Sequence, residues 1–425
     1  MTAMRILHLN DLHDPRIGSS IRQMYQLAEL QRAAGHASAV LTATPEPADA
    51  TPTEILGSQV FRVHSRYDPR WRAWVGLRNR RALPAIERVL DEYRPDVVHT
   101  HLIHSHLSYA SLTAARARGA AVVFTAHDVM TFCYQKLTCF HGGEEHGGKL
   151  RDYQAAWQKC LPCQRLRWRP DRNARIRAIL ARDVQRFTTV SEELARAIRA
   201  NGIRVDRVVH NAIPGTLVLP SARAVADFRE KQGLVGKHVI TIAGRLHEQK
   251  GVLQLFRMLA ELGRELPDVR LMVMGHRKVY DAEFAHHARD LGVDRFVVPT
   301  GWLDGEELAA AYSATDVFVT PSICFDTFGL VNLEAMEHEK PVVATAFGGS
   351  PEVVEHGVTG FVENPFDVAA FAGRVRELLL DPALARRMGQ AGRRRMLERF
   401  TTTRLAAEFA EEYELALGAA RASAR

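Results

Sequence analysis

The sequence predicts an α/β protein with two domains, because strand-like and helix-like patterns alternate along it and this alternation starts twice. The first series begins with the apolar run 5–9 and a helical pattern that opens at Gly18. The second series begins at the β-branched run 239–243. A chain of 425 residues is long enough for two domains with large cores. The predicted parts are residues 1–214, with an insert at 129–170, residues 215–400, and a C-terminal helix in residues 401–425.

The composition is ordinary for a globular protein. The chain is 46% hydrophobic and 25% charged, with a formal net charge of +7. No run approaches the roughly 18 apolar residues that a membrane-spanning helix needs. Residues 1–10 lack the basic start and the cleavage site of a signal peptide. We therefore expect a cytoplasmic protein.

Positive charge is concentrated in residues 149–186, which contain eleven Lys or Arg and three Asp. Such a strip is usually a solvated helix face, and the alternative is contact with an anionic surface at the inner face of the membrane. Aromatic residues are not interleaved with these charges in the way that favours nucleic acid. We therefore expect no nucleic-acid partner.

One stretch of the second domain predicts a strand, a sharp loop and a helix start that together suit an anion. The run 317–320 has the pattern of a buried strand, and Gly329 allows a tight turn before a helical pattern begins at Leu330. A helix N-terminus presents unpaired N–H groups and the positive end of its dipole. A phosphate group is therefore the expected ligand.

Charged residues accompany the predicted helix starts of this domain. Asp326 and Glu334 bracket the turn just described, and the alternative role for Asp326 is a helix cap. Arg245 and Lys250 flank the helix start that follows the strand 239–243. Two cations with free amides between them form a cradle for a diphosphate, and the alternative is a solvated loop.

Histidines gather near predicted strand ends in the first domain. His127 and Asp128 follow the predicted strand 121–126, and ligands of open α/β sheets bind beyond such carboxyl ends. His127 is expected to donate to a substrate hydroxyl or to support a developing positive charge, and its alternative is a bond to a backbone carbonyl. Four further histidines alternate nearby and suggest either a metal cluster or ordinary polar loop residues. They are His99, His101, His104 and His106.

Four cysteines lie within 31 residues of the insert, with His141 among them. In a cytosolic enzyme such a group more often binds a metal than forms disulfides. Cys160 and Cys163 have zinc-knuckle spacing, whereas the spacing of Cys133 and Cys139 is less usual. The two interpretations are a structural zinc site and free thiols.

Several motifs together resemble family 4 of the retaining glycosyltransferases. They are Gly244-Arg245-Leu246 with Lys250-Gly251, Pro321-Ser322, Phe328-Gly329-Leu330-Val331, Glu334-Ala335-Met336 and Gly348-Gly349-Ser350-Pro351-Glu352. The resemblance spans nearly the whole chain. It implies the GT-B fold, in which two Rossmann-like doubly wound domains face a cleft and the C-terminal helix crosses back to the first domain. It also implies a nucleotide-diphosphate sugar as the donor, held mostly by the second domain.

The resemblance implies roles for individual residues. The implied donor-binding residues are Gly18, Arg245, Lys250, Asp326, Phe328, Gly329, Leu330 and Glu334. The implied catalytic residues are His127, Asp326, Lys250 and Arg245. Arg245 and Lys250 would bind the donor diphosphate, Glu334 the ribose hydroxyls and Asp326 the hydroxyls of the donor sugar, while His127 faces the reacting sugar or the acceptor.

Two positions depart from the pattern of the family. Asp326 stands where the family usually has Glu, which draws the carboxylate back by roughly 1.5 Å, one carbon–carbon bond, and leaves the identity of the donor sugar open. Gly18 is single where many relatives have a glycine pair.

The expected reaction is the transfer of a hexose with retention of configuration to a hydroxyl of a sugar, a lipid-linked compound or a small molecule. No cofactor is expected for catalysis, because no Asp-x-Asp motif stands at a strand end. The first alternative is a nucleotide-sugar epimerase or hydrolase of the same fold. The second is a non-enzymatic, zinc-stabilised basic binding protein, which leaves Arg245, Lys250 and Glu334 unexplained.

Overall fold

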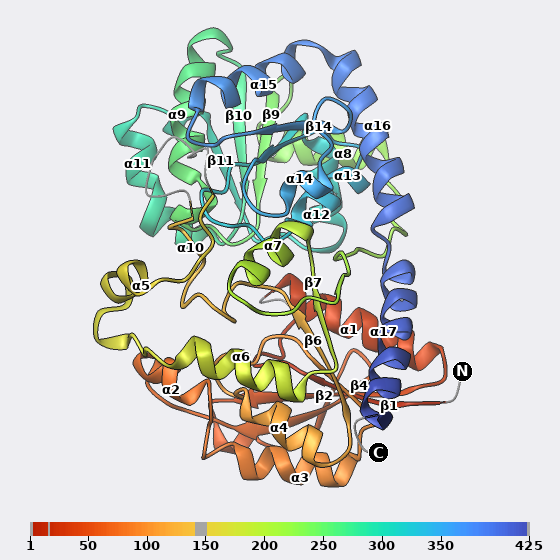
Figure 1. Ribbon diagram of the computed structural model, residues 1–425. Helices are drawn as coiled ribbons and strands as arrows, with labels where there is room; N and C mark the ends of the chain where they lie inside the picture. The colour runs from red at the N-terminus through yellow and green to blue at the C-terminus, as the bar shows by residue number, and fades with distance from the viewer. Residues whose placement is uncertain (1–2, 16–17, 141–150, 423–425) are drawn as a thin grey trace. The chain divides into compact units, whose positions relative to one another are not determined.

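The computed structural model describes residues 3–15, 18–140 and 151–422, and the chain divides into two compact units (Figure 1). Unit 1 comprises Met1–Leu137, Tyr153–Ala212 and Thr402–Arg425, and unit 2 comprises Thr138–Asp152 and Ile213–Thr401. Each unit contains its own sheet with helices packed on it, so the predicted α/β class with two Rossmann-like domains is confirmed. Among the described residues, no helix is both long and apolar enough to cross a membrane.

Unit 1 is built on an eight-stranded sheet in the order β3-β4-β2-β1-β5-β6-β7-β8, parallel except for β3. Its strands are β1 Arg5–Leu9, β2 Ala37–Thr44, β3 Thr53–Ile55, β4 Ser58–His64, β5 Val97–Thr100, β6 Ala121–Ala126, β7 Arg186–Thr189 and β8 Arg207–Val208. Its helices are α1 Ser19–Ala33, α2 Arg72–Val75, α3 Leu83–Tyr93, α4 Ala110–Ala117, α5 Trp157–Gln164, α6 Arg172–Asp183, α7 Glu192–Ala200 and α17 Thr402–Ala422. The strand order reverses between β1 and β5, so the loops that follow these two strands meet at the carboxyl edge of the sheet.

Unit 2 is built on a six-stranded parallel sheet in the order β11-β10-β9-β12-β13-β14. Its strands are β9 His238–Ala243, β10 Val269–Met274, β11 Val297–Gly301, β12 Val317–Thr320, β13 Val342–Thr345 and β14 Gly360–Glu363. Its helices are α8 Ala222–Lys231, α9 Val252–Glu265, α10 Arg277–Val279, α11 Ala285–Asp290, α12 Gly305–Ala314, α13 Leu330–Glu337, α14 Ser350–Val353, α15 Val368–Leu380 and α16 Pro382–Arg399. Here the strand order reverses between β9 and β12.

The C-terminal helix α17 packs on the sheet of unit 1. Its apolar residues Leu405, Phe409 and Tyr413 share a core cluster with residues of β1, β5 and β6. The carboxylate of Glu412 is fully buried and accepts a hydrogen bond of 2.7 Å from Nε of Arg186 on β7. A buried carboxylate needs such a partner, so this ion pair fixes the helix on the sheet.

One part of the insert belongs to unit 2. Sequence analysis assigned all of 129–170 to the first domain, whereas the structure groups Thr138–Asp152 with unit 2. The ring of Phe140 is buried and lies edge-on to Phe347 and Phe325, with ring centroids 5.1 and 6.0 Å apart. The buried aromatic side chain is the physical reason for the difference, because it completes an apolar cluster in the second unit.

Candidate functional site

The site in unit 2 lies where the strand order reverses. Lys250 ends the short turn after β9, and Asp326 lies in the loop after β12, the neighbouring strand. In open parallel sheets, ligands bind beyond the carboxyl ends of the strands at such a point. The order of the strands therefore brings together two predicted site residues that are 76 positions apart in the sequence.

Lys250 and Asp326 form an ion pair that is sheltered from solvent mainly on the aspartate side. Lys250 Nζ lies 2.7 Å from Asp326 Oδ2, and the side chains are 39% and 12% exposed. Ser322 Oγ also donates to Asp326 Oδ2, at 3.1 Å. Burial alone would raise the pKa of Asp326, but the charge of Lys250 and these hydrogen bonds lower it below its ordinary value. Burial alone would lower the pKa of Lys250, and Asp326 raises it instead.

Two glycines let the loops of this site touch through their backbones. Gly251 and Gly348 have φ of +76° and +69°, in the left-handed region. A Cβ on Gly251 would lie 1.8 Å from the carbonyl oxygen of Pro321, and one on Gly348 would lie 1.9 Å from that of Asp326. The loops after β9, β12 and β13 are therefore packed too closely for any side chain at these positions.

Gly329 forms the start of α13. Its φ is +81°, and it is the N-cap residue of this eight-residue helix, with no side chain capping the helix. Asp326 is therefore not the helix cap of the alternative interpretation, and its carboxylate pairs with Lys250 instead. Phe328 and Leu330 are both buried, so only their backbone groups are suited to face a ligand.

The other predicted donor-binding residues of unit 2 differ in their contacts. Glu334 Oε2 accepts a hydrogen bond of 2.7 Å from the hydroxyl of Tyr312. Arg245 is exposed, and its charge lies close enough to Lys250 to oppose the raised pKa of that residue. The predicted pair of cations is therefore present at the start of α9, one paired and one exposed.

The site residues of unit 1 follow strands on both sides of its own reversal point. Gly18 precedes α1 in an extended conformation, and a Cβ there would meet only Ile21, at 3.7 Å. His127 follows β6, and its Nε2 lies 2.9 Å from Nδ1 of His101, which follows β5. Burial lowers the pKa of His127 to about 4. At Nε2, His127 therefore contacts a second imidazole rather than the backbone carbonyl of the alternative interpretation.

The four alternating histidines do not form one cluster. His104 Nε2 lies 3.2 Å from Asp128 Oδ1, and His106 Nδ1 lies 3.0 Å from the hydroxyl of Ser65. Burial alone would raise the pKa of Asp128, but His104 lowers it. His99 and His101 instead lie beside a residue that sequence analysis missed, His8 on β1. Its only signal was a polar residue within an apolar strand.

The four cysteines of the insert all lie in its described part and differ in exposure. Cys133 and Cys160 are half-buried, whereas Cys139 and Cys163 are exposed. Among the described residues, the one group of three potential ligands with nitrogen, sulfur or oxygen atoms within 4.8 Å of one another is His8, His99 and His101. His141 lies outside the described residues, so zinc binding by the insert stays a prediction. The metal content of the purified protein tests it.

In comparisons with known proteins, each half of the chain matches a glycosyltransferase family model. Residues 225–395 match the family model described as glycosyl transferases group 1, and residues 18–212 match that described as glycosyl transferase 4-like domain. Over 431 residues the chain is 27% identical to glycogen synthase of Mycobacterium tuberculosis, covering 96% of this chain and 94% of that protein.

Two further similarities differ in extent. Over 198 residues the chain is 38% identical to a GDP-mannose-dependent alpha-(1-6)-phosphatidylinositol monomannoside mannosyltransferase of Mycolicibacterium smegmatis, covering 45% of this chain and 52% of that protein. This match thus spans about half the length of the relative. Sucrose-phosphate synthase from Thermosynechococcus elongatus superimposes with a TM-score of 0.75 at 22% identity, covering 98% of this chain and 100% of that one. This likeness shows the fold.

Proposed function

Because the chain belongs to the glycosyltransferases, with the GT-B fold and a match to a family model in each half, we propose that it transfers a sugar from a nucleotide-diphosphate sugar to an acceptor hydroxyl with retention of configuration. One observation carries this proposal. The Lys250–Asp326 pair lies beside the N-terminus of α13 at the reversal point of the sheet of unit 2. A cation, a carboxylate and helix amides at one place suit the diphosphate and the sugar hydroxyls of one donor.

The leaving group defines what the protein must stabilise. When the bond between the anomeric carbon and the diphosphate oxygen breaks, negative charge develops on the diphosphate and positive charge on the sugar ring. Lys250, Arg245 and the amides at Gly329 are suited to stabilise the first charge. The carboxylate of Asp326 is suited to accept hydrogen bonds from the sugar hydroxyls, and Glu334 from those of the ribose.

The chemical step that we propose is a front-face displacement. The acceptor oxygen forms its bond to the anomeric carbon on the face from which the diphosphate leaves, and the proton of the acceptor hydroxyl passes to the departing phosphate oxygen. Configuration is retained because bond formation and bond breakage share one face. No protein nucleophile and no metal ion enter this step.

A thermal-shift screen against GDP-mannose, UDP-glucose, ADP-glucose and dTDP-glucose tests the donor site. A ligand that binds only the folded protein stabilises it by about 2.7 kcal/mol at a hundredfold excess over its dissociation constant. We expect one nucleotide sugar to raise the Tm selectively. If none of them raises the Tm of the wild-type protein, the assignment of the site in unit 2 is wrong.

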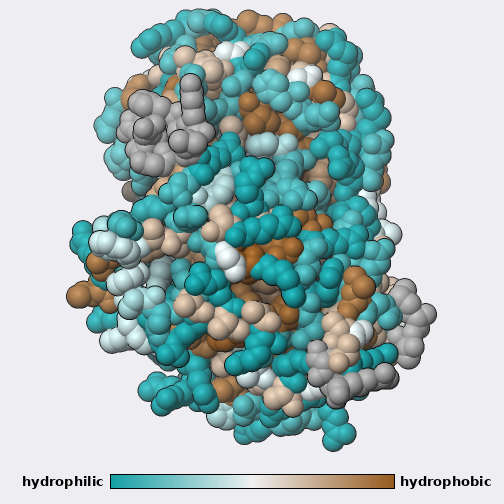
Figure 2. All heavy atoms as spheres, in the orientation of Figure 1, coloured by the Kyte–Doolittle hydropathy of each residue, from teal (hydrophilic) through white to brown (hydrophobic). Residues whose placement is uncertain are grey.

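The surface around α5 supports contact with an anionic membrane. Apolar side chains there are exposed: Trp157 by 63%, Leu161 by 40% and Leu166 by 98%. Basic side chains alternate with them, and these are Lys159, Arg165 and Arg167. Where Figure 1 draws α5, Figure 2 shows apolar and intermediate residues among hydrophilic ones. Apolar residues that insert between lipids, flanked by cations, are typical of peripheral membrane surfaces.

Co-sedimentation with vesicles tests this membrane contact. We expect binding to vesicles that contain anionic phospholipid, little binding to neutral vesicles, and severalfold weaker binding of Leu166→Asp because it removes an apolar side chain and adds a negative charge. Leu56→Asp is the matched control, since Leu56 is also exposed in unit 1 but lies in the turn between β3 and β4. Equal binding of both variants and the wild type would reject this surface.

A further inference from the structure

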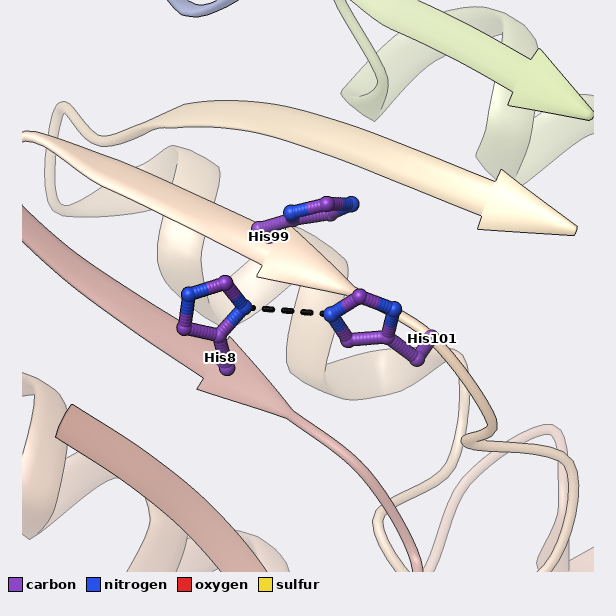
Figure 3. Close-up of side chains that lie close together, drawn as sticks. All are labelled: His8, His99 and His101. Carbon is purple, nitrogen blue, oxygen red and sulfur yellow. Dashed lines mark hydrogen bonds between the residues drawn. The ribbon is translucent and has the colours of Figure 1, made fainter. Parts of the chain in front are cut away.

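A continuous chain of buried hydrogen bonds runs inward from His127. His127 Nε2 lies 2.9 Å from His101 Nδ1, and His101 Nε2 lies 3.1 Å from His8 Nδ1. His8 Nε2 in turn lies 2.8 Å from Oε1 of Gln31 on α1. Figure 3 shows the rings of His8 and His101 with their nitrogens facing each other. We call His8, His101 and Gln31 the histidine relay.

The chain continues beyond Gln31 to the C-terminal helix and back into the sheet. Gln31 Nε2 lies 2.9 Å from the hydroxyl of Tyr413 on α17, which lies 2.8 Å from His99 Nδ1. His99 Nε2 lies 2.7 Å from the hydroxyl of Thr125, which lies 2.7 Å from that of Thr188. Thr188 finally donates to the backbone carbonyl of Phe124, at 3.5 Å.

The imidazoles of this chain are neutral at neutral pH. Burial lowers the pKa of His8 and of His127 to about 4. Burial likewise lowers the pKa of His99 and His101 well below the ordinary value. A neutral imidazole carries one N–H, so one of its nitrogens donates and the other accepts.

The backbone carbonyl at the inner end gives the chain its direction, because it can only accept. Donation of the single hydroxyl proton of Thr188 to this carbonyl favours the arrangement in which Thr125 donates to Thr188 and accepts from His99 Nε2–H. His99 Nδ1 then accepts from Tyr413, whose oxygen accepts from the amide of Gln31.

The same orientation of the Gln31 amide determines the outer half of the chain. Its Oε1 faces His8 and also accepts from Ser38, at 2.8 Å. His8 must therefore donate through Nε2 and accept through Nδ1, and His101 must do the same. Consequently Nε2 of His127 carries the hydrogen and Nδ1 carries the lone pair.

We propose that the histidine relay positions His127 and holds it as the neutral Nε2–H tautomer, so that Nδ1 accepts a hydrogen bond from a substrate hydroxyl. His101 and His8 are positioning residues that act through His127. The substrate part rests on the proposed glycosyl transfer, whereas the tautomer is a property of the protein without substrate. A fixed tautomer avoids reorganisation when the hydroxyl arrives.

The same histidines are less suited to a metal. His8, His99 and His101 have nitrogen atoms within 4.8 Å of one another. Both nitrogens of His99, however, bind hydroxyl groups, at 2.8 and 2.7 Å, and Figure 3 shows its ring beside the His8–His101 pair rather than between them. A tetrahedral metal site needs lone pairs that converge on one point.

Nuclear magnetic resonance of the 425-residue chain with ¹⁵N-labelled histidine tests the tautomer directly. Long-range proton–nitrogen correlations distinguish a protonated ring nitrogen from one with a lone pair, and single histidine substitutions assign the signals. We expect a lone pair on Nδ1 and a hydrogen on Nε2 for His8, His101 and His127. A hydrogen on Nδ1 of His127, or a shift of the assigned His8, His99 or His101 signals on addition of Zn²⁺, overturns the proposal whether or not the protein transfers sugar.

Two variants of His101 test the positioning role. In His101→Gln, the amide oxygen accepts from His127 and the amide nitrogen donates to His8, whereas His101→Leu breaks both bonds. We expect His101→Leu to lower kcat by about 10²-fold with KM for the donor within twofold, and to produce both tautomers of His127. We expect His101→Gln to keep the tautomer and to recover kcat to within about fivefold. Equal kcat values for the wild type and a folded His101→Leu variant would refute the positioning role.

Discussion

Replacing Lys250 with Ala is expected to lower the turnover number of sugar transfer by about 10³-fold. The change removes the cation that pairs with Asp326 in the proposed diphosphate site, and removing one group that stabilises developing charge costs about 10²- to 10³-fold in other enzymes. It also leaves Asp326 without its 2.7 Å partner. Release of the nucleoside diphosphate under saturating donor measures the effect.

The matched control for this prediction is Lys231→Ala. Lys231 lies at the end of α8 in the same unit and also pairs with a carboxylate, that of Glu307, but it is 66% exposed. Exposed pairs contribute about 0–1 kcal/mol to stability, so this variant should keep its activity. Equal loss in both variants, or a near-normal rate in Lys250→Ala, would show that Lys250 has no role at the diphosphate.

The pH dependence of stability provides a second test of the Lys250–Asp326 ion pair. The folded-state pKa of Asp326 is lowered, so its contribution to stability is present above the ordinary Asp pKa of about 3.9 and is lost as the pH falls through the folded-state value. In Lys250→Ala the principal cause of the lowering is absent. We therefore expect the Tm difference between wild type and variant to be largest near neutral pH and to narrow below about pH 4.

Replacing Gly348 with Ala is expected to abolish donor binding and to lower the Tm strongly. The new Cβ would lie 1.9 Å from the carbonyl oxygen of Asp326, a separation that forces the loop after β12 to move. The backbone hydrogen bond of 2.7 Å from Gly349 to the same oxygen would be disrupted. Differential scanning calorimetry and the donor-induced Tm shift measure the two effects.

The variant Gly233→Ala separates the effect of the steric clash at Gly348 from the effect of backbone strain. Its φ of +68° matches the +69° of Gly348, but a Cβ there meets nothing within 4 Å. Only the strain of a left-handed alanine applies, about 1–2 kcal/mol, and the donor-induced shift should persist. If the two alanine variants lose the same stability and both still bind the donor, close contact between these loops does not maintain the site.

Local patterns were sufficient to predict much of unit 2. The run 317–320 is strand β12, the turn at Gly329 begins α13, and Gly251 begins α9. Each of these features depends on residues within a few positions of one another, which is the range over which backbone conformation and helix termini are determined. The role of Asp326 was not determined locally, because its partner Lys250 reaches it only through the order β9-β12 in the sheet.

The histidines show the limit of sequence proximity. Grouping His99 with its sequence neighbours His104 and His106 failed, because successive strands of a parallel sheet bring together residues from distant segments. His101 lies beside His8, 93 residues earlier, and beside His127, 26 residues later. Likewise, the helical pattern of the C-terminus did not show that Tyr413 would join this chain through Gln31.

The sequence by itself thus determined the two α/β domains and the glycine turns, since short-range backbone preferences and hydrophobic periodicity suffice for these, and its motifs indicated the residues of the proposed donor site. Only the tertiary structure decided that the side chains of Phe328 and Leu330 are buried, that Phe140 joins unit 2, and that buried imidazoles extend inward from His127. These features depend on strand order and on the exclusion of water from packed cores, and both arise from contacts between segments far apart in the chain.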